Sequence, residues 1–175
     1  MKGLILYRIL TFILVPIAAI LSLFALMAVL VALSNPALLL GAFMLACMII
    51  YIFCSFKFLN KGILANQPCK HSLRDWIRVN AFVTIAFAFL SLFQSTALLS
   101  DPKLLHDTIT GRLPTQSELP SSISVESLKN TMIGTLYFMV FLSVVLIIHI
   151  FITFRLLKVY KYLFDDNNSN NTTLL

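Results

Sequence analysis

The feature that most constrains this chain is a run of 48 residues without a charge, between Arg8 and Lys57. A membrane-spanning helix needs about 20 consecutive apolar residues, so a run of this length predicts two spanning helices with a tight turn between them. The turn is predicted at the Ser-Asn-Pro sequence of residues 34–36, because asparagine is a good N-terminal cap and proline fits the first helical position. The two spans are therefore expected at about 9–33 and 37–57.

Two further uncharged runs predict two more spans, at about 79–99 and 130–154. Of the 175 residues 59% are apolar and only 11% charged, whereas a soluble domain is about 25% charged. This composition excludes a soluble globule and a nucleic-acid-binding domain, and the runs lack the polar–apolar alternation of a membrane β-barrel. We expect an all-α integral membrane four-helix bundle, forming a single domain over 1–164, with a disordered Asn-rich cytoplasmic tail over 165–175.

Lysine and arginine are distributed unequally between the two sides of the predicted bundle. Ten lie on the side of both termini and the second connection: Lys2, Arg8, Lys57, Lys61, Lys70, Arg74, Arg78, Arg155, Lys158 and Lys161. Three lie in the third connection, 101–129: Lys103, Arg112 and Lys129. Because positively charged loops are retained in the cytoplasm, we expect both termini there and the 101–129 loop, about 30 residues long, outside. A bacterial inner membrane is the expected location.

Signals for helix ends occur in both long connections. Gly62 is expected to end the second helix, since glycine favours the position just past a helix C-terminus. Ser72 and Asp75 have the spacing of a capping box, which predicts a third helix that begins below the membrane surface. In the outer loop, Asp101 is expected to cap a short helix over 102–110.

The start of the third helix carries a group of basic and aromatic residues. Arg74 and Arg78 are four positions apart and so share a helix face, with Trp76 at headgroup depth. We interpret the three as an interfacial anchor. The alternative interpretation is a docking site for anionic lipid or for an acidic cytosolic partner.

Small residues recur along the third span at spacings of 3, 4, 3 and 4: Ala81, Thr84, Ala88, Ser91 and Ser95. They fall on one helix face, whereas Phe82, Phe89 and Phe93 lie on another. Small residues let two helix backbones approach closely, and a period of about 3.5 residues is typical of left-handed packing. We therefore expect this seam to pack against a neighbouring helix and not to form a binding site.

His149 is the one histidine inside a predicted span. Counting from the cytoplasmic charges places His149, Tyr51 and Thr84 each six residues above a basic residue, which is about 9 Å along a helix. Asn80 lies one turn lower than Thr84. We expect a neutral His149 that forms a hydrogen bond with Tyr51, Thr84 or Asn80, and a structural role is favoured over a proton or ligand role.

Several residue types and motifs needed for transport or catalysis are absent from the sequence, and this restricts the classes of function that we expect. No Asp, Glu, Lys or Arg lies inside a predicted span, which argues against a proton-coupled pump. The three cysteines have no metal-ligand spacing, and there is no hydrolase, zinc-protease or phosphate-loop motif.

We expect a non-catalytic structural, regulatory or assembly component without catalytic residues, cofactor or metal. Its expected partners are the lipid bilayer and another membrane protein or a second copy of the chain, not nucleic acid. Two alternatives stay open. One is a subunit of an oligomeric transporter or channel, and the other is a membrane enzyme that uses His149.

Overall fold

The computed structural model describes residues 2–112 and 125–165, and all regular structure within them is helical. The helices are α1 (Lys2–Ser34), η1 (Pro36–Leu38), α2 (Leu39–Lys57), η2 (Phe58–Leu64), α3 (His71–Ser100), α4 (Pro102–Arg112), α5 (Val125–Val159) and α6 (Tyr162–Asp165). Four segments are long and apolar enough to cross a membrane: Gly3–Ser34, Pro36–Leu64, His71–Ser100 and Lys129–Val159. The predicted all-helical chain with four helices of spanning length is confirmed. Each segment extends past the predicted span at both ends, because a helix continues where its apolar run stops.

The chain divides into two compact units. Unit 1 comprises the residues up to Phe87 together with those from Leu146 onward, and unit 2 comprises Ala88–Val145. The single domain expected over 1–164 stays a prediction. The expected disordered tail falls on 166–175, outside the described residues, apart from its first residue, which ends α6.

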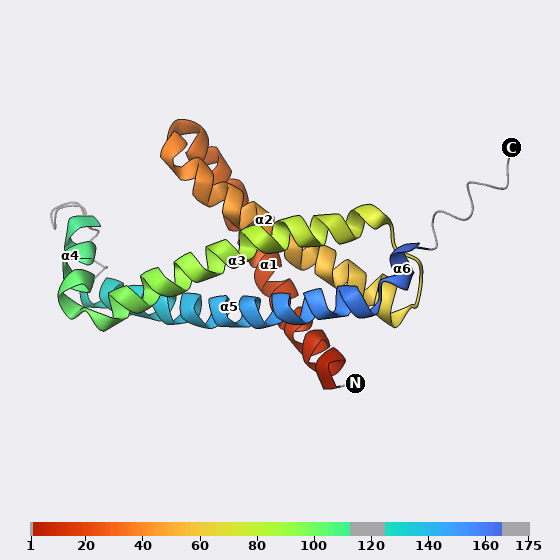
Figure 1. Ribbon diagram of the computed structural model, residues 1–175. Helices are drawn as coiled ribbons and strands as arrows, with labels where there is room; N and C mark the ends of the chain where they lie inside the picture. The colour runs from red at the N-terminus through yellow and green to blue at the C-terminus, as the bar shows by residue number, and fades with distance from the viewer. Residues whose placement is uncertain (1, 113–124, 166–175) are drawn as a thin grey trace, which may run out of the picture. The chain divides into compact units, whose positions relative to one another are not determined.

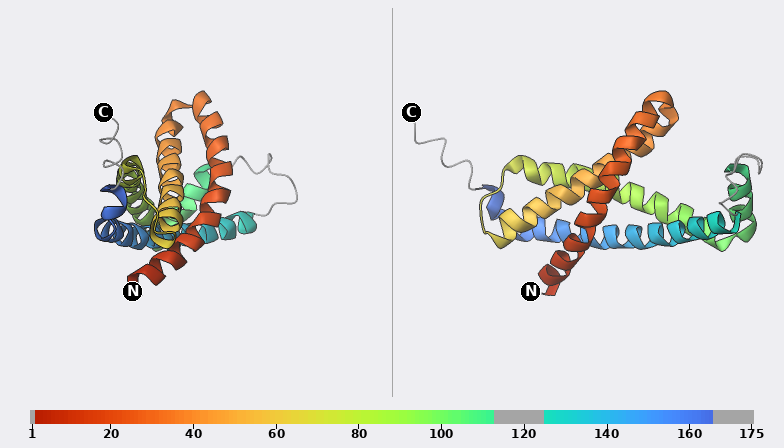
Figure 2. Two further views of the ribbon diagram at one scale, coloured as in Figure 1. Left: turned by 90° about the vertical axis from the view of Figure 1, so that its right-hand side faces the viewer. Right: turned by 180° about the vertical axis from the view of Figure 1, so that it is seen from behind.

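In unit 1, α1 and α2 form an antiparallel hairpin, whose helices lie together near their turn and diverge toward the start of α1 and the end of α2 (Figure 1, Figure 2). The Asn35 side chain accepts a hydrogen bond from the backbone N–H of Ala37 at 3.2 Å, and Pro36 occupies the first helical turn. The predicted turn and cap are confirmed. The first turn after the cap is a short 3₁₀ helix, η1, before α2 begins at Leu39.

The buried stripe of α1 begins with Tyr7, Thr11, Leu14 and Ala18, each with no exposed surface. Their spacings of four, three and four residues keep one face toward α2 and α5, as in left-handed helix packing. Pro16 lies inside α1 and is exposed. Proline has no N–H to donate to the carbonyl of Phe12, four residues earlier, and such a break in the hydrogen-bond ladder is tolerated in membrane helices.

The second spanning helix ends later than predicted. After α2 the chain continues as a π-helix, η2, which ends at Leu64. Asn66, two residues later, has a left-handed φ of 47°. The backbone N–H of Gln67 donates to the carbonyl of Lys61 at 3.1 Å. Asparagine is one of the few residues that adopt this conformation easily, so it closes the helix as a glycine would.

Gly62 was predicted to end this helix, and that prediction is wrong. The glycine is buried inside η2, where a Cβ atom would lie 3.1 Å from the ring of Phe58 and 3.2 Å from the Sγ atom of Cys69. Both distances are shorter than ordinary van der Waals contact. Glycine therefore serves close packing here and not backbone freedom, because a Cβ atom would require Phe58 and Cys69 to shift by a few tenths of an ångström.

The start of α3 also differs from its prediction. The helix begins at His71, so Ser72 lies inside it and does not occupy the cap position. The Asp75 carboxylate contacts the ring of His71 at 3.1 Å and the Nε atom of Arg74 at 3.9 Å. The Asp75 carboxylate therefore interacts with His71 and Arg74. In a capping box it would instead accept a hydrogen bond from a backbone N–H at the helix N-terminus.

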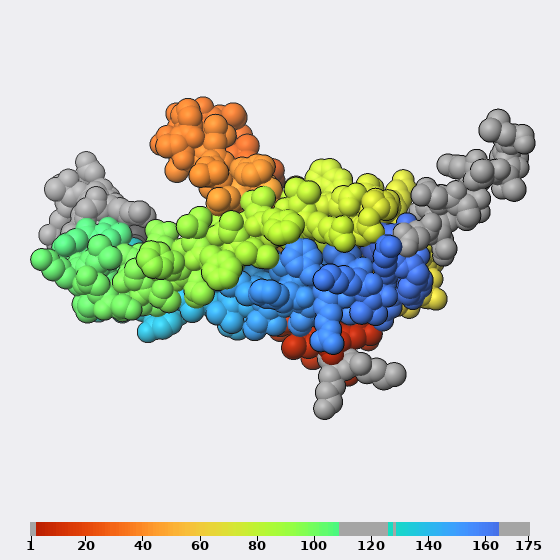
Figure 3. Space-filling view, viewed as in Figure 1, coloured from red at the N-terminus to blue at the C-terminus, as the bar shows by residue number. Residues whose placement is uncertain are grey.

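The C-terminal end of unit 1 is tied to the connection that follows η2. The backbone N–H of Cys69 donates to the carbonyl of Leu163 in α6 at 2.7 Å, and the rings of Phe58 and Phe164 stack at 5.5 Å. Nearby, α3 and α5 meet through Phe82 and Phe154, with ring centroids 5.7 Å apart. The space-filling view shows the first half of α3 lying against the last part of α5 (Figure 3).

Unit 2 contains the short helix α4, whose N-terminus is capped by Asp101. Its carboxylate accepts hydrogen bonds from the backbone N–H groups of Lys103 and Leu104 at 2.9 and 3.1 Å, which confirms the predicted cap. An apolar cluster of this unit consists of Leu98, Leu105 and Leu136, flanked by Leu99, Met132 and Ile133. Ser95 and Ser143 are buried in this unit as well.

Candidate functional site

Polar side chains from three helices of unit 1 meet in one fully buried group, here called the His149 cluster. Its members are Tyr7 and Thr11 of α1, Tyr51 and Ser55 of α2, and His149 and Thr153 of α5, each with no exposed surface. Lipid tails offer no hydrogen-bond partners, so polar groups buried in a membrane protein must satisfy one another.

The imidazole of His149 lies at the centre of the cluster. Its Nδ1 atom is 2.7 Å from the Tyr51 hydroxyl, and its Nε2 atom is 2.9 Å from the Thr11 hydroxyl. The ring of Tyr7 stacks on it at a centroid distance of 4.9 Å, while the Tyr51 ring meets it edge-on at 5.6 Å. Both nitrogens therefore have a partner, and aromatic rings cover one face and one edge of the imidazole.

The hydrogen bonds extend on both sides of the ring. The Thr11 hydroxyl donates to the carbonyl of Tyr7 at 2.7 Å, and the Thr153 hydroxyl donates to the carbonyl of His149 at 2.8 Å. The hydroxyls of Tyr51 and Thr153 are 2.9 Å apart. A chain of polar contacts thus runs through the cluster from one backbone carbonyl to another.

A neutral imidazole has one donor and one acceptor nitrogen, so both ring nitrogens have a partner in either tautomer. If Nε2 carries the proton, it donates to Thr11 and Nδ1 accepts from Tyr51, and the Thr153 hydroxyl then donates either to Tyr51 or to the carbonyl of His149. In the other tautomer Nδ1 donates to Tyr51, Tyr51 donates to Thr153, and Thr11 donates to Nε2 in place of the carbonyl of Tyr7. Each tautomer thus gives up one side-chain contact, and a carbonyl left in this way keeps its own helical N–H donor.

The cluster joins each pair of the three helices. Thr11 and His149 connect α1 to α5, and Tyr51 connects α2 to α5. The Tyr7 hydroxyl closes the triangle between α1 and α2, since it lies 2.8 Å from the Ser55 hydroxyl and donates to the Ser55 carbonyl at 3.2 Å. Such directional contacts specify which helices are neighbours and how far each slides along the others.

Of the three partners expected for His149, the structure places Tyr51 against the ring. Thr84 and Asn80 are buried, but the Thr84 hydroxyl donates to the carbonyl of Asn80 at 2.7 Å, and the Asn80 amide donates to that of Trp76 at 2.8 Å. Their hydrogen bonds thus return to α3 itself, since Thr and Asn side chains can reach the carbonyl one turn back.

Sequence reasoning missed Tyr7, Thr11 and Ser55 as members of the cluster. A signal for them exists in the spacing. The six members form three pairs of polar residues four positions apart: Tyr7 and Thr11, Tyr51 and Ser55, His149 and Thr153. Each pair presents two polar groups on one face of an apolar helix. Such a pattern indicates that the three faces meet.

The predicted seam of α3 and the predicted anchor have clear positions in the structure. Of the seam residues Ala81, Thr84, Ala88 and Ser95 are buried and Ser91 is half-buried, whereas Phe82, Phe89 and Phe93 are exposed. In the anchor, Trp76 and Arg78 are exposed. Arg74 is not, because its side chain is 13% exposed and its guanidinium lies over the ring of Phe164 at 6.0 Å.

Two hollows lie between α2 and α3 in unit 1. The upper hollow, of about 390 Å³, is lined mainly by apolar side chains of both helices. The lower one, of about 310 Å³, is lined by three lysines, two cysteines and the first residues of α3. Burial raises the pKa of the Cys69 thiol, which lines this hollow, whereas Lys61 and Lys57 lower it by a smaller amount.

Within residues 2–112 and 125–165, no three His, Cys, Asp or Glu side chains gather in a way that could hold a metal ion. The arrangement therefore offers one closed polar cluster and one open groove as candidate sites. Comparison with models of protein families, with curated proteins and with solved structures finds no match to this chain.

Proposed function

We propose that this protein is a non-catalytic membrane component with a structural, regulatory or assembly role, exerted through contacts with other membrane proteins and with lipids. The observation that carries the proposal is the closure of the His149 cluster. Each of its polar side chains has a partner within the cluster and no exposed surface. A catalytic or proton-carrying histidine needs a path to substrate or water, so this closure supports a role in holding helices together.

The exposed surface of α1 supports the contact role. Beyond the buried stripe the helix carries large apolar side chains that are more than half exposed, among them Leu23, Phe24, Leu26, Met27, Leu30 and Leu33. In a bilayer such a face meets lipid or the helix of another protein.

We further propose that both termini lie in the cytoplasm of a bacterium, with the protein in its inner membrane. In unit 1, Tyr7 near the start of α1 bonds to Ser55 near the end of α2, and Cys69 bonds to Leu163 in α6. The start of α1, the connection after η2 and the C-terminal end are therefore neighbours. These are the segments that carry most of the lysines and arginines, which supports their assignment to the cytoplasmic side.

The functional proposal is tested by comparing membranes from the source bacterium with and without the gene. We expect native electrophoresis and quantitative proteomics to show loss of a membrane complex in the deletion strain. The wild-type gene and a His149→Gln gene should restore that complex equally. Restoration by the wild type alone, with the variant folded and present at the same level, would assign chemistry to the ring and overturn the proposal. Flux of ions or small solutes through proteoliposomes that contain only this protein would instead favour a transporter or channel.

The orientation is tested with a membrane-impermeant thiol reagent on two exposed positions. Lys103→Cys should react in intact cells, and Gln67→Cys only after the cells are opened. Native Cys69 is an unsuitable reporter, because it is 2% exposed and its thiol pKa is raised. The unchanged chain is the control for background labelling. The reverse pattern of labelling would invert the proposed topology.

A further inference from the structure

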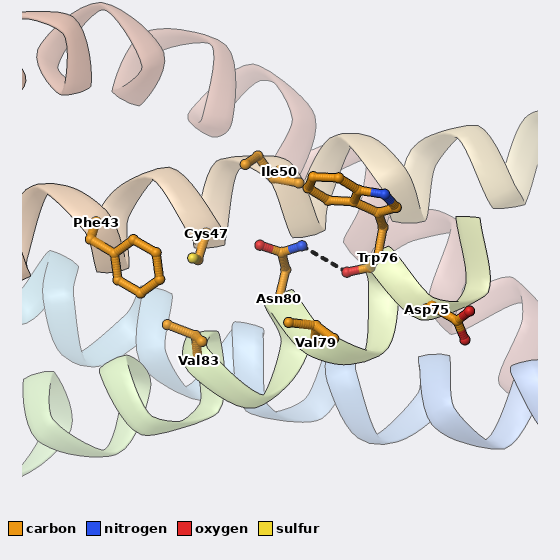
Figure 4. Close-up of a pocket in the computed structure, with 8 residues that line it drawn as sticks. All are labelled: Phe43, Cys47, Ile50, Asp75, Trp76, Val79, Asn80 and Val83. Carbon is orange, nitrogen blue, oxygen red and sulfur yellow. Dashed lines mark hydrogen bonds between the residues drawn. The ribbon is translucent and has the colours of Figure 1, made fainter. Parts of the chain in front are cut away.

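The groove between α2 and α3 combines two kinds of wall that a single ligand can contact together. Its upper hollow lies between Phe43 and Cys47 of α2 and Val79 and Val83 of α3 (Figure 4). The one amide in the wall, that of Asn80, donates to the carbonyl of Trp76 at 2.8 Å and is thereby satisfied. The upper hollow therefore offers an apolar slot at the level of the spanning segments.

The lower hollow has the opposite character. Lys57, Lys61 and Lys70 line it and are exposed, and no acidic residue is among its lining residues. The Ser72 hydroxyl and the first turn of α3 complete the wall. The N-terminus of α3 adds partial positive charge to that of the lysines, although the N–H of Leu73 already donates to the carbonyl of Lys70 at 2.9 Å. An anion is therefore the ligand that this end of the groove attracts.

Trp76 lines both hollows, so the apolar slot and the cationic pocket adjoin at one side chain. Tryptophan favours the boundary between lipid tails and headgroups, which is the depth at which an acyl chain gives way to a phosphate. The slot has one acidic lining residue, Asp75, whose carboxylate contacts His71 and Arg74. Its charge is therefore partly offset where the headgroup would approach.

We propose that the α2–α3 groove binds one anionic glycerophospholipid, with an acyl chain in the upper hollow and its phosphate among Lys57, Lys61 and Lys70. An acidic peptide or a free phosphate would use the lysines but leave the apolar slot empty, and a neutral lipid would use the slot alone. The site needs only that α2 and α3 lie in the bilayer, so it stands independently of the assembly role proposed above.

Trp76 is the one tryptophan of the chain, so the intrinsic tryptophan fluorescence reports on this site. The purified full-length protein is placed in vesicles of unlabelled phosphatidylcholine with increasing amounts of lipid brominated on its acyl chains. Bromine quenches tryptophan fluorescence on contact. We expect brominated phosphatidylglycerol to quench Trp76 at roughly tenfold lower mole fraction than brominated phosphatidylcholine, since lysines near the membrane surface attract anionic lipid.

The variant K57Q/K61Q/K70Q should bring the two lipids to equal quenching. The matched control R155Q/K158Q/K161Q removes the same number of charges from exposed positions that line neither hollow, and it should retain the preference. An equal loss in both variants would indicate general attraction to the surface and overturn the site. Equal quenching of the wild type by the two lipids would overturn it as well.

Two further measurements separate the lipid from other anions. Val79→Phe fills the slot at an exposed position, and it should lower quenching by both brominated lipids while circular dichroism and thermal stability stay unchanged. Millimolar inorganic phosphate or an acidic peptide should not reverse quenching by phosphatidylglycerol at constant ionic strength. Reversal by either would replace the lipid with a soluble anion as the occupant and overturn the proposal.

Discussion

The interiors of the two units differ in their polar groups. Unit 1 contains the polar His149 cluster, whose residues have no exposed surface. Unit 2 has a cluster of the aliphatic side chains Leu98, Leu105 and Leu136, each 9% exposed, and the polar residues buried among its described residues are the serines Ser95 and Ser143. Both units use parts of α3 and α5, so the contrast arises within single helices.

This difference shows what specifies helix packing inside a membrane. Lipid tails are as apolar as leucine, so bringing leucines together gains little hydrophobic free energy there, and hydrogen bonds and close packing decide the arrangement. Thr131 and Thr135 in unit 2 are polar as well, yet they are exposed and donate to carbonyls one turn back in α5. A hydroxyl on a spanning helix therefore specifies a neighbour only when a second polar group faces it.

The sharpest way to break the contrast is Tyr7→Ala in unit 1. The substitution removes a fully buried ring that stacks on His149 and a hydrogen bond to Ser55. It should lower the free energy of unfolding by about 3 kcal/mol, as for other buried aromatic residues. Tyr137→Ala in unit 2, where the side chain is exposed, should change it by less than about 0.5 kcal/mol. Equal losses in denaturant titrations in detergent micelles would contradict the contrast.

The small-residue seam of α3 is the next test, because it specifies packing without polar bonds. Ala88 is fully buried and Phe89 is exposed. Ala88→Leu should destabilise the protein by about 2 kcal/mol through overpacking, whereas Phe89→Leu should have little effect. Thermal unfolding in detergent measures both. If the two variants lose the same stability, the seam does not face a neighbouring helix.

Substitutions at one glycine in each unit allow the local packing at the two positions to be compared. A methyl group at Gly62 of unit 1 would meet Phe58 and Cys69 at 3.1 and 3.2 Å, but one at Gly134 of unit 2 has no neighbour within 4 Å. Gly62→Ala should cost about 1 kcal/mol. Gly134→Ala should stabilise the protein by up to about 1 kcal/mol, since alanine loses less backbone entropy in a helix. Opposite signs of the shift in melting temperature are the expected result.

The smallest effect is expected at the centre of the cluster. His149→Gln keeps one donor and one acceptor, so it should retain part of the hydrogen bonding to Tyr51 and Thr11. A hydrogen bond between membrane helices averages about 0.6 kcal/mol, and the loss should be of that size. Thr135→Val in unit 2 is the control and should be silent. A loss several times larger for His149→Gln would mean that the ring contributes far more than its hydrogen bonds.

Local features of the fold were predictable from the sequence. The number of spanning helices follows from the spacing of charges, and the caps at Asn35 and Asp101 form as expected. Each cap depends on atoms within one helical turn. The burial of Ala81 and Ala88, and the exposure of Phe89, likewise follow from the periodicity of a single helix.

Contacts between helices were only partly predictable. Counting residues from the basic groups leads to Tyr51 as a partner of His149, but it also leads to Thr84, which bonds within α3. The same counting leaves out Thr11, which is only three residues from Arg8, or about 4.5 Å along the helix. The method assumes that the basic residues of all helices lie at one depth, and α1 does not meet that assumption.

The sequence by itself determined the helical class, the four apolar segments and the small-residue face of the third segment, because hydropathy and helix periodicity depend on residues close together in the chain. Only the tertiary structure decided that α1, and not α3, supplies the second partner of His149, and that Phe58 and Cys69 pack closely against the glycine at position 62. These outcomes depend on which helices become neighbours and how far each slides along the next. Such choices rest on atoms that are distant in the sequence and meet only after the helices have packed.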